Sequence, residues 1–374
     1  MKAYNESWVN NRAANAKIKA WELEGVLKES EIEPLEDQFY SPNVYVWMGL
    51  FFFTSIAISF CSGLFLSLIG FSENSSVLGV VLVIFAGGLL FVLETFIRNK
   101  KLYWSGIDNA MLYCILGFLI AAFYVFTSSF SPPFYVFSIV YFIFSLPFIY
   151  RYAEPFIAAN TAISLFIFVS LILFEFSIFK PLLPFVLIVI SGGLFLFLQR
   201  TEATLYYKKA VLFTSVVSAS VACLASNFYV VKESNEALLK TDFVGVSSVG
   251  FWVLSFTVPL AFLFFGLKKK DRVSFLVGLV GLEASVVAVR IYFDFFPTEW
   301  ALIIIGLLLG VFAVFFLKFL QKTKCGITSA TSRKEGLQNI EGIVFSQAFH
   351  ANDGSNSIEF GGGDFGGGGA SGDV

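Results

Sequence analysis

Charged residues are scarce in this chain. Only 14% of its 374 residues are charged and 57% are hydrophobic, whereas a soluble domain has roughly 25% charged residues. A soluble protein of this length needs a polar exterior, and this sequence lacks the charge to build one. The 48 phenylalanines point the same way. The composition therefore excludes an ordinary soluble protein and predicts an integral membrane protein.

Cysteine and histidine are scarcer still. Cys61, Cys114, Cys223 and Cys325 are scattered and form no CxxC pair, so neither a disulfide framework nor a zinc site is predicted. His350, the single histidine, lies in a glycine-rich tail. No HExxH, GxSxG or paired-aspartate pattern occurs in the apolar runs. We therefore expect no enzyme activity, no cofactor and no metal. The net charge of −2 gives no indication of a nucleic-acid partner.

Apolar runs long enough to cross a bilayer recur along the chain. A helix of about 20 residues spans the hydrocarbon core, so the runs predict an all-α, polytopic transmembrane bundle of about ten helices. Prolines in SSFSPP (128–133) and FKPLLP (179–184) make the least distinct separations, and one bent helix at either place would change the count. The expected spans are 44–70, 77–97, 109–128, 132–150, 155–179, 181–198, 210–231, 246–267, 273–296 and 300–320.

The positions of lysine and arginine predict the orientation of the bundle. These residues concentrate on the cytoplasmic side of membrane proteins. Counted from the N-terminus, nearly all of them fall on one side of the predicted spans. The exceptions are Lys180, Lys232 and Lys240 on the other side, and Arg290 within a helix. We therefore expect both termini in the cytoplasm. We expect no cleavable signal peptide, because the first apolar run begins only near residue 44.

Residues 1–43 are predicted to form a helical hairpin on the cytoplasmic face. Asn5 or Ser7 is suited to cap a first helix that runs to about Glu24. Ser30 and, three residues later, Glu33 have the spacing of a capping box for a second helix. We expect the hairpin to pack on the bundle or on the lipid headgroups, and binding of a protein partner is the alternative.

The three predicted regions are the hairpin, the bundle over 44–320 and a tail over 321–374. The tail ends in EFGGGDFGGGGASGDV, and so much glycine predicts a mostly disordered segment. Its alternative role is a recognition peptide for a protein partner. The lipid bilayer is the partner that the whole sequence implies.

Two motifs carry a resemblance. WELEGVLKESEIEPLEDQF (21–39), followed by many apolar helices, resembles bacterial multi-pass membrane proteins of the domain-of-unknown-function type, whose N-termini carry such a short helical hairpin. The tail GGGDFGGGGASGDV is similar to glycine-rich ends of bacterial membrane proteins, including those with TPM domains. This chain lacks the TPM domain, so no activity is implied. The resemblance implies a bacterial inner-membrane protein.

The stretch GLEASVVAVRIYFDFFPTEW (281–300) places Glu283, Arg290 and Asp294 in an apolar run. Their spacing puts the three side chains on one helix face, with Glu283 near mid-membrane. Each charge near the bilayer centre costs at least ~2.5–3.5 kcal/mol, so we expect this face to meet protein or water. One interpretation is a ligand or proton site, with Arg290 holding an anion or Glu283 carrying a proton. The alternative is a charge cluster that fixes helix packing.

Three further polar residues are weaker candidates. Glu94 lies at the inner interface, where snorkelling explains it. Glu175 lies near Lys180 at the outer end of its helix, where an interfacial pair is the alternative to a functional role. Asn160, with Thr161, is placed either to line a cavity or to join two helices by polar packing.

Two stripes of small residues and one repeated segment bear on packing. Ser55, Ser59, Gly63 and Ser67 form one stripe, and Ser215, Ala219, Ala222 and Ser226 form the other. Small residues at this spacing permit close approach of another helix. VLVIFAGGLLFVL (81–93) matches VLIVISGGLFLFL (186–198), which suggests an internal duplication of parallel four-helix units.

The sequence favours a non-catalytic membrane scaffold or sensor, because intramembrane polar groups are few. The alternative is a small-solute or proton-linked carrier that uses the charged face of the ninth helix, and internal repeats are frequent in carriers.

Overall fold

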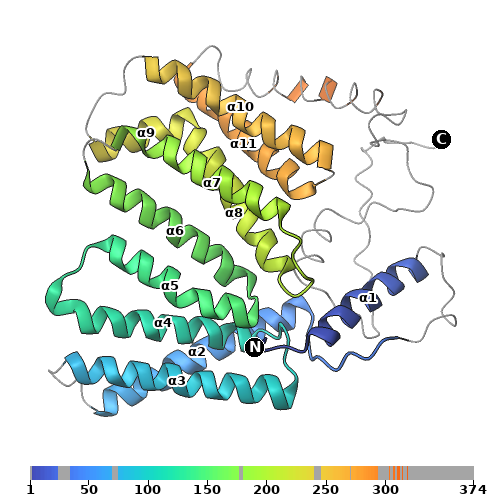
Figure 1. Cartoon of the computed structure of the whole chain (residues 1–374), viewed down its shortest axis with the longest axis vertical. Coiled ribbons are helices and arrows are strands. Elements are labelled where there is room, and N and C mark those ends of the chain that lie inside the picture. The colour runs from blue at the N-terminus through green and yellow to red at the C-terminus, as the bar shows by residue number, and fades with distance from the viewer. Residues whose placement is uncertain are drawn as a thin grey trace, which may run out of the picture.

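The computed structural model describes residues 2–23, 34–69, 75–176, 180–239, 246–269 and 271–293, together with single positions between 303 and 318. Every regular element in these ranges is a helix (Figure 1), as the predicted all-α fold requires. Backbone polar groups that face lipid have no water to bond, so an apolar segment crosses a bilayer as a helix.

Nine helices in the described ranges are long and apolar enough to cross a membrane, and the chain is a multi-pass membrane protein. The predicted span 300–320 is described only at single helical positions, so the tenth span stays a prediction. The nine helices are α2 (Val44–Ile69), α3 (Ser75–Lys100), α4 (Ile107–Thr127), α5 (Phe134–Tyr152), α6 (Pro155–Glu175), α7 (Leu183–Arg200), α8 (Lys208–Ser226), α10 (Val246–Lys269) and α11 (Arg272–Tyr292).

The two proline-containing breaks separate distinct helices, as predicted. A single 3-10 turn (Ser128–Phe130) follows α4, and α5 begins directly after Pro133. Pro184 lies in the first turn of α7. N–H groups in the first turn have no hydrogen-bond acceptor within the helix, so proline, which lacks an N–H, is tolerated there.

The predicted seventh span, 210–231, is wrong at its end. α8 stops at Ser226, and the following residues belong to a separate short helix, α9 (Phe228–Leu239). The side-chain oxygen of Asn227 accepts hydrogen bonds from two N–H groups in the first turn of α9, at 3.0 and 3.3 Å. An asparagine used in this way caps a new helix instead of continuing the previous one.

Consecutive helices pack side by side as hairpins (Figure 1). α3 packs on α4, α5 on α6, α7 on α8 and α10 on α11. Two further contacts each have a counterpart later in the chain. The contact of α2 with α4 corresponds to that of α6 with α8, and the contact of α4 with α5 corresponds to that of α8 with α10. The packing therefore repeats with a step of four spanning helices, and the two similar Gly-Gly-Leu segments lie on α3 and α7. An internal duplication predicts this arrangement, and the duplication itself stays a hypothesis.

The N-terminal region begins with helix α1 (Glu6–Leu23), and the predicted end at about Glu24 lies outside the described residues. The side-chain oxygen of Asn5 accepts a hydrogen bond from the N–H of Ser7 at 3.0 Å, so Asn5 is the predicted cap. The side chain of Asn15 exchanges two hydrogen bonds with the backbone of Leu35, at 2.8 and 2.9 Å. The returning chain is thus fastened along α1.

The second helix of the predicted hairpin is not found where the structure describes the chain. Residues 34–43 are not helical, and Ser30 and Glu33 lie outside the described residues. The backbone of Tyr40 instead pairs with the loop between α3 and α4, donating to the carbonyl of Lys101 at 3.0 Å and accepting from the N–H of Tyr103 at 3.1 Å.

Aromatic side chains hold this N-terminal cap, defined here as residues 2–23 and 34–43, on the bundle. Phe39 stacks on Tyr103 with ring centroids 4.7 Å apart, and Tyr4 meets Tyr103 edge-on at 5.0 Å. Trp8 packs edge-on against Phe39 at 5.2 Å. Such pairs add to the free energy of burying the rings themselves. The predicted packing of the N-terminal region on the bundle is confirmed for these residues.

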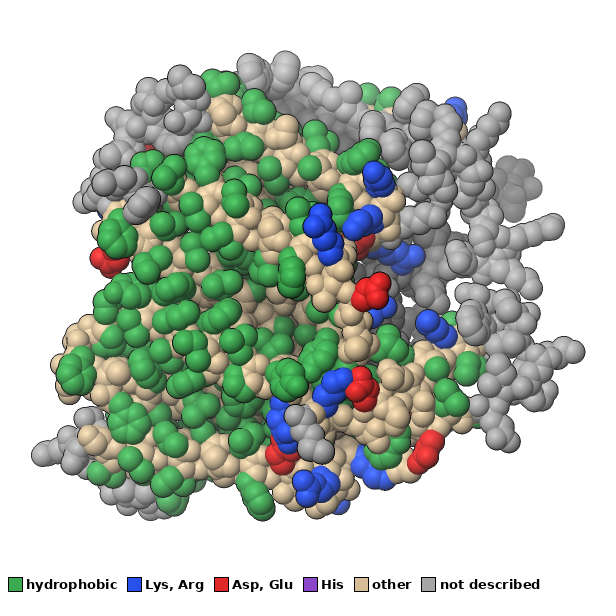
Figure 2. All heavy atoms as spheres, viewed as in Figure 1, with side chains coloured by type: hydrophobic (Ala, Val, Ile, Leu, Met, Phe, Trp, Pro, Cys, Tyr) green, Lys and Arg blue, Asp and Glu red, His purple; other side chains and the backbone are tan. Residues whose placement is uncertain are grey.

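Charged side chains gather at the capped end of the molecule, and the rest of the visible face is mostly hydrophobic (Figure 2). We call this the basic end, because the lysines and arginines at the adjoining ends of α3, α5, α7, α8 and α10 lie there: Lys100, Arg151, Arg200, Lys208, Lys209, Lys268 and Lys269.

The two predicted small-residue stripes have different fates. All four residues of the α8 stripe are buried, Ala219 completely. In the α2 stripe, by contrast, Ser59, Gly63 and Ser67 are exposed, and a Cβ at Gly63 would meet no atom within 4 Å. The prediction of close packing is confirmed for α8. The described residues provide no helix against the α2 stripe.

Candidate functional site

The charged face predicted on α11 does not point into the described bundle. The residues of α11 that pack inward are Ser274, Gly278, Gly281, Ser285 and Ala288, and Glu283 lies on the opposite, exposed side. No ion pair of Glu283 is recorded in the described residues. Arg290 is half-buried, and Asp294 lies outside the described residues. The structure therefore shows Glu283 exposed among the described residues, and the grouping of the three residues stays a prediction.

Of the weaker candidates, Glu94 has a role that the sequence did not indicate. Its carboxylate accepts two hydrogen bonds from Arg151 on α5, at 2.7 and 2.8 Å, and a third from the hydroxyl of Tyr152. Glu94 is thus a bidentate ion-pair partner between α3 and α5, and snorkelling alone is the wrong explanation for it.

Glu175 differs from expectation as well, whereas Asn160 and Thr161 follow the second of their two alternatives, polar packing between helices. Glu175 is exposed at the end of α6, and the expected ion pair with Lys180 is not formed among the described residues. Asn160 is exposed and hydrogen-bonds Tyr141 on α5. Its neighbour Thr161 donates to the hydroxyl of Ser145 at 2.7 Å, so this pair joins α5 and α6 by polar packing.

A buried polar network that the sequence analysis missed lies under the cap. The side chain of Asp108, in the first turn of α4, is completely buried. It accepts hydrogen bonds from the hydroxyl of Tyr4 at 2.9 Å and from the N–H groups of Trp104 and Ser105 at 3.0 and 2.9 Å. A buried carboxylate is tolerated only with partners of this kind. Asp108 thus locks the start of the chain onto α4.

Glu154 forms the second part of the network, at the start of α6. Its carboxylate caps α6 by accepting from the N–H of Ile157 at 2.6 Å. It also accepts from the side-chain amide of Asn109 and the hydroxyl of Tyr113, both at 3.2 Å. Burial raises the pKa of Glu154 to about 7, against the hydrogen bonds from Ile157 and Tyr113, which lower it. This carboxyl therefore changes charge near neutral pH.

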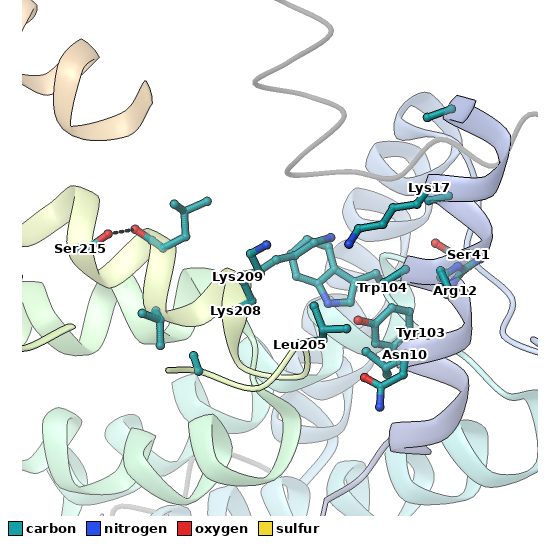
Figure 3. A pocket seen from close by; sticks show the side chains of 18 of the residues that line it. Asn10, Arg12, Lys17, Ser41, Tyr103, Trp104, Leu205, Lys208, Lys209 and Ser215 are labelled. Atoms are coloured by element: carbon teal, nitrogen blue, oxygen red, sulfur yellow. Dashed lines mark hydrogen bonds between the residues drawn. The ribbon is translucent and has the colours of Figure 1, made fainter. Parts of the chain in front are cut away.

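Next to this network, the cap and the bundle line a partly open cavity of about 1030 Å³. We call it the basic cavity. α1 forms one wall and the start of α8 the other, with Trp104 between them (Figure 3). Lys17 reaches in from α1, and Lys208 and Lys209 extend from α8 (Figure 3). The charged side chains that line it are Arg12, Lys17, Lys208, Lys209, Lys269 and Asp271.

Arg12 is the most deeply buried of these cations, with 8% of its surface exposed. Its Nε lies 3.1 Å from a carboxylate oxygen of Asp37, and its guanidinium carbon lies 5.8 Å from the ring centroid of Tyr103. Its Nη1 is buried without a hydrogen-bond partner, alone among the buried side-chain atoms of the described residues. A buried donor without an acceptor is costly.

The facing wall supplies two more ordered cations. Lys209 Nζ lies 4.1 Å from the ring centroid of Trp104, and Lys269 Nζ lies 4.6 Å from that of Phe265. The lining acid, Asp271, caps α11 by accepting from the N–H of Val273 at 3.2 Å. It also accepts from the side chain of Gln199 at 3.1 Å. The cavity thus contains cationic side chains that lie over aromatic rings, and its one carboxylate already accepts hydrogen bonds from the protein. This arrangement suits an anionic ligand.

Comparison with known protein families, curated proteins and solved structures finds no match. The assignment of a role therefore depends on the geometry alone.

Part of this site could be predicted from patterns in the sequence. Glu154 precedes Pro155, and an acidic residue followed by proline is typical of a helix start. The lysines were recognised as markers of orientation, but nothing in the sequence brings Arg12 and Lys17 to the start of α8. That proximity results from the docking of the cap, which depends on contacts such as Tyr4 with Asp108.

Proposed function

We propose that this protein is a non-catalytic sensor of the bacterial inner membrane that binds an anionic ligand in the basic cavity. In this proposal the basic end faces the cytoplasm, as the distribution of lysine and arginine predicts. The observation that carries the proposal is the set of five cationic side chains, Arg12 and four lysines, that line one cavity.

The charges favour an anion over any other ligand class. Five cationic side chains and one carboxylate line the cavity, and no ion pair is recorded within the described residues for Lys17, Lys208 or Lys269. Guanidinium groups bind phosphate and carboxylate oxygens through directed hydrogen bonds. We therefore expect a phosphate- or carboxylate-bearing ligand.

The position of α1 supports a sensor. α1 contributes one wall of the cavity, so an anion bound between Arg12 or Lys17 and α8 stabilises the docked position of the cap. A ligand shifts such an equilibrium by its difference in affinity for the two states. The outer surface of α1 is then available to a protein partner in a ligand-dependent way.

The carrier hypothesis has less support. Its proposed site depended on Glu283, which is exposed, and neither Glu283 nor Arg290 lines the basic cavity. The buried acids Asp108 and Glu154 lie at the basic end of the bundle and not at its middle, where carriers bind their substrates.

Binding of inorganic pyrophosphate to the purified full-length protein in a neutral detergent tests the proposal. We expect pyrophosphate to raise the unfolding temperature and to slow amide hydrogen exchange in residues 6–23, because the ligand bridges α1 and α8. Lys17→Gln/Lys269→Gln is expected to lose most of both effects.

A matched control is Lys19→Gln/Lys268→Gln, which removes the same charge from the same two helices. Neither control residue lines the cavity. An unchanged unfolding temperature at every pyrophosphate concentration, or equal losses in the two double variants, would contradict the proposal.

A further inference from the structure

We infer that the ligand of the basic cavity is an anionic phospholipid, bound through its phosphate headgroup, from the leaflet that borders the basic end. The inference deepens the proposed function and rests on it, because it names the ligand class of the same cavity.

The cavity has an apolar part in addition to its charges. Val44 and Trp47 of α2, Leu198 of α7, and Val211 and Leu212 of α8 all line it. These five residues lie inside candidate membrane spans. A free phosphate or a small sugar phosphate has no apolar part to contact these residues. A glycerophospholipid carries its apolar chains next to its phosphate and can contact both kinds of residue.

The depth of the cavity matches a lipid. On α8 the lining runs from Lys208 to Ser215, which corresponds to about 10 Å along the helix axis. The headgroup layer of a bilayer is roughly 5–8 Å thick on each side. A ligand with its phosphate at Lys208 and Lys209 therefore reaches the acyl region at Leu212 and Ser215.

Access from the bilayer exists on the side of α2. Within the described residues, the membrane-spanning part of α2 has no buried residue. This is because α4 is the one helix there with which α2 makes an extensive contact. An acyl chain can lie along α2 while the headgroup occupies the cavity. Trp47 stands at this border, as tryptophan does at membrane interfaces.

The charges select among lipids. A zwitterionic headgroup contains a positively charged group, which the five cationic side chains of the cavity would repel. An anionic headgroup such as phosphatidylglycerol contains no positive charge. Arg12 and the four lysines line the cavity, and guanidinium and ammonium groups form charge-assisted hydrogen bonds with phosphate oxygens. Basic pockets between membrane helices are suited to anionic headgroups for the same reason.

The test places the full-length protein in nanodiscs of phosphatidylcholine with increasing phosphatidylglycerol and measures retained lipid and unfolding temperature. We expect saturable retention of phosphatidylglycerol and a raised unfolding temperature. Lys17→Gln/Lys269→Gln should weaken the apparent affinity about tenfold to thirtyfold. Lys17→Arg/Lys269→Arg should retain it, and Lys19→Gln/Lys268→Gln should change it less than about threefold. The unfolding temperature in pure phosphatidylcholine shows whether each variant folds.

Three outcomes would overturn the lipid assignment. If pyrophosphate binds in detergent but phosphatidylglycerol is retained no better than phosphatidylcholine, the ligand is a soluble anion and the proposed function stands. If the two glutamine variants lose phosphatidylglycerol equally, attraction is spread over the whole basic end and the cavity is not a lipid site. If neither anion binds, the proposed function falls together with the lipid.

Discussion

At the basic end, α4 and α6 are joined by hydrogen bonds among Asn109, Tyr113 and Glu154, whereas α10 and α11 meet along small residues. A Cβ added at Gly278 of α11 would lie 2.6 Å from the backbone nitrogen of Leu263 on α10. Two helix contacts of one bundle are therefore held by very different chemistry.

The difference determines what each contact tolerates. The polar contact depends on the charge of the buried Glu154, whose pKa lies close to neutral. The small-residue contact contains no titrating group among its buried α11 residues and depends on side-chain volume alone. Substitutions chosen for one property at a time separate the two kinds of contact.

The largest effect is expected from Gly278→Val. The added side chain would collide with backbone atoms of α10, at 2.6 Å from Leu263 N and 2.8 Å from Pro259 O, and backbone cannot move aside as a side chain can. We expect a loss of about 3 kcal/mol in the free energy of unfolding, measured by thermal or chemical unfolding in detergent. Gly88→Val is the control, because its Cβ would meet no atom within 4 Å. Equal losses in both variants would contradict the close packing of α10 and α11.

Glu154→Gln should remove a pH dependence. The pKa of Glu154 is raised from 4.5 to about 7 in the folded state. The folded protein therefore holds this proton more tightly than the unfolded one, and stability falls as pH rises from about 4.5 to 7. We expect the variant to match the wild type near pH 4.5. At pH 8 it should be more stable by roughly 2–3 kcal/mol. Parallel curves of stability against pH would show that Glu154 does not titrate as inferred.

Arg151→Ala and Glu94→Ala should each have a moderate effect, because they remove a bidentate ion pair between α3 and α5. The pair is partly exposed, so we expect a loss of about 1 kcal/mol for each. The double variant should lose less than the sum of the two. Unfolding measured for all four proteins gives the coupling, and strict additivity would mean that the pair contributes nothing.

The smallest effect is expected from Glu283→Gln. This side chain is exposed and has no ion pair in the described residues, so stability should change by no more than about 0.5 kcal/mol. Combined with Arg290→Ala, the change should be additive. A marked loss of stability, or coupling between the two substitutions, would support the predicted charged face that meets protein or water.

The sequence predicted the helices well, because a run of apolar residues is a local property. It missed the end of the seventh span because Asn227 is one polar residue within an apolar stretch. The two small-residue stripes look alike in sequence, yet only the α8 stripe is buried, since the number of neighbours of a helix is not encoded in its own residues.

The candidate site was beyond reach of the sequence for a related reason. Asp108 and Glu154 lie at helix ends, where acids are ordinarily solvated, but both are buried here, and Asp108 is bonded by Tyr4 of the docked cap. Conversely, Glu283 drew attention because it interrupts an apolar run. A charge in such a run implies a special environment, but periodicity does not say which face of the helix the environment occupies.

The docking of Tyr4 has a consequence for biosynthesis. Its hydroxyl bonds Asp108, the preceding residue bonds the carbonyl of Arg151, and its ring contacts Tyr206. None of these partners has been made when residues 3 and 4 are translated. Residues 3 and 4 therefore reach their final positions only after the chain through Tyr206, which follows α7, has been made.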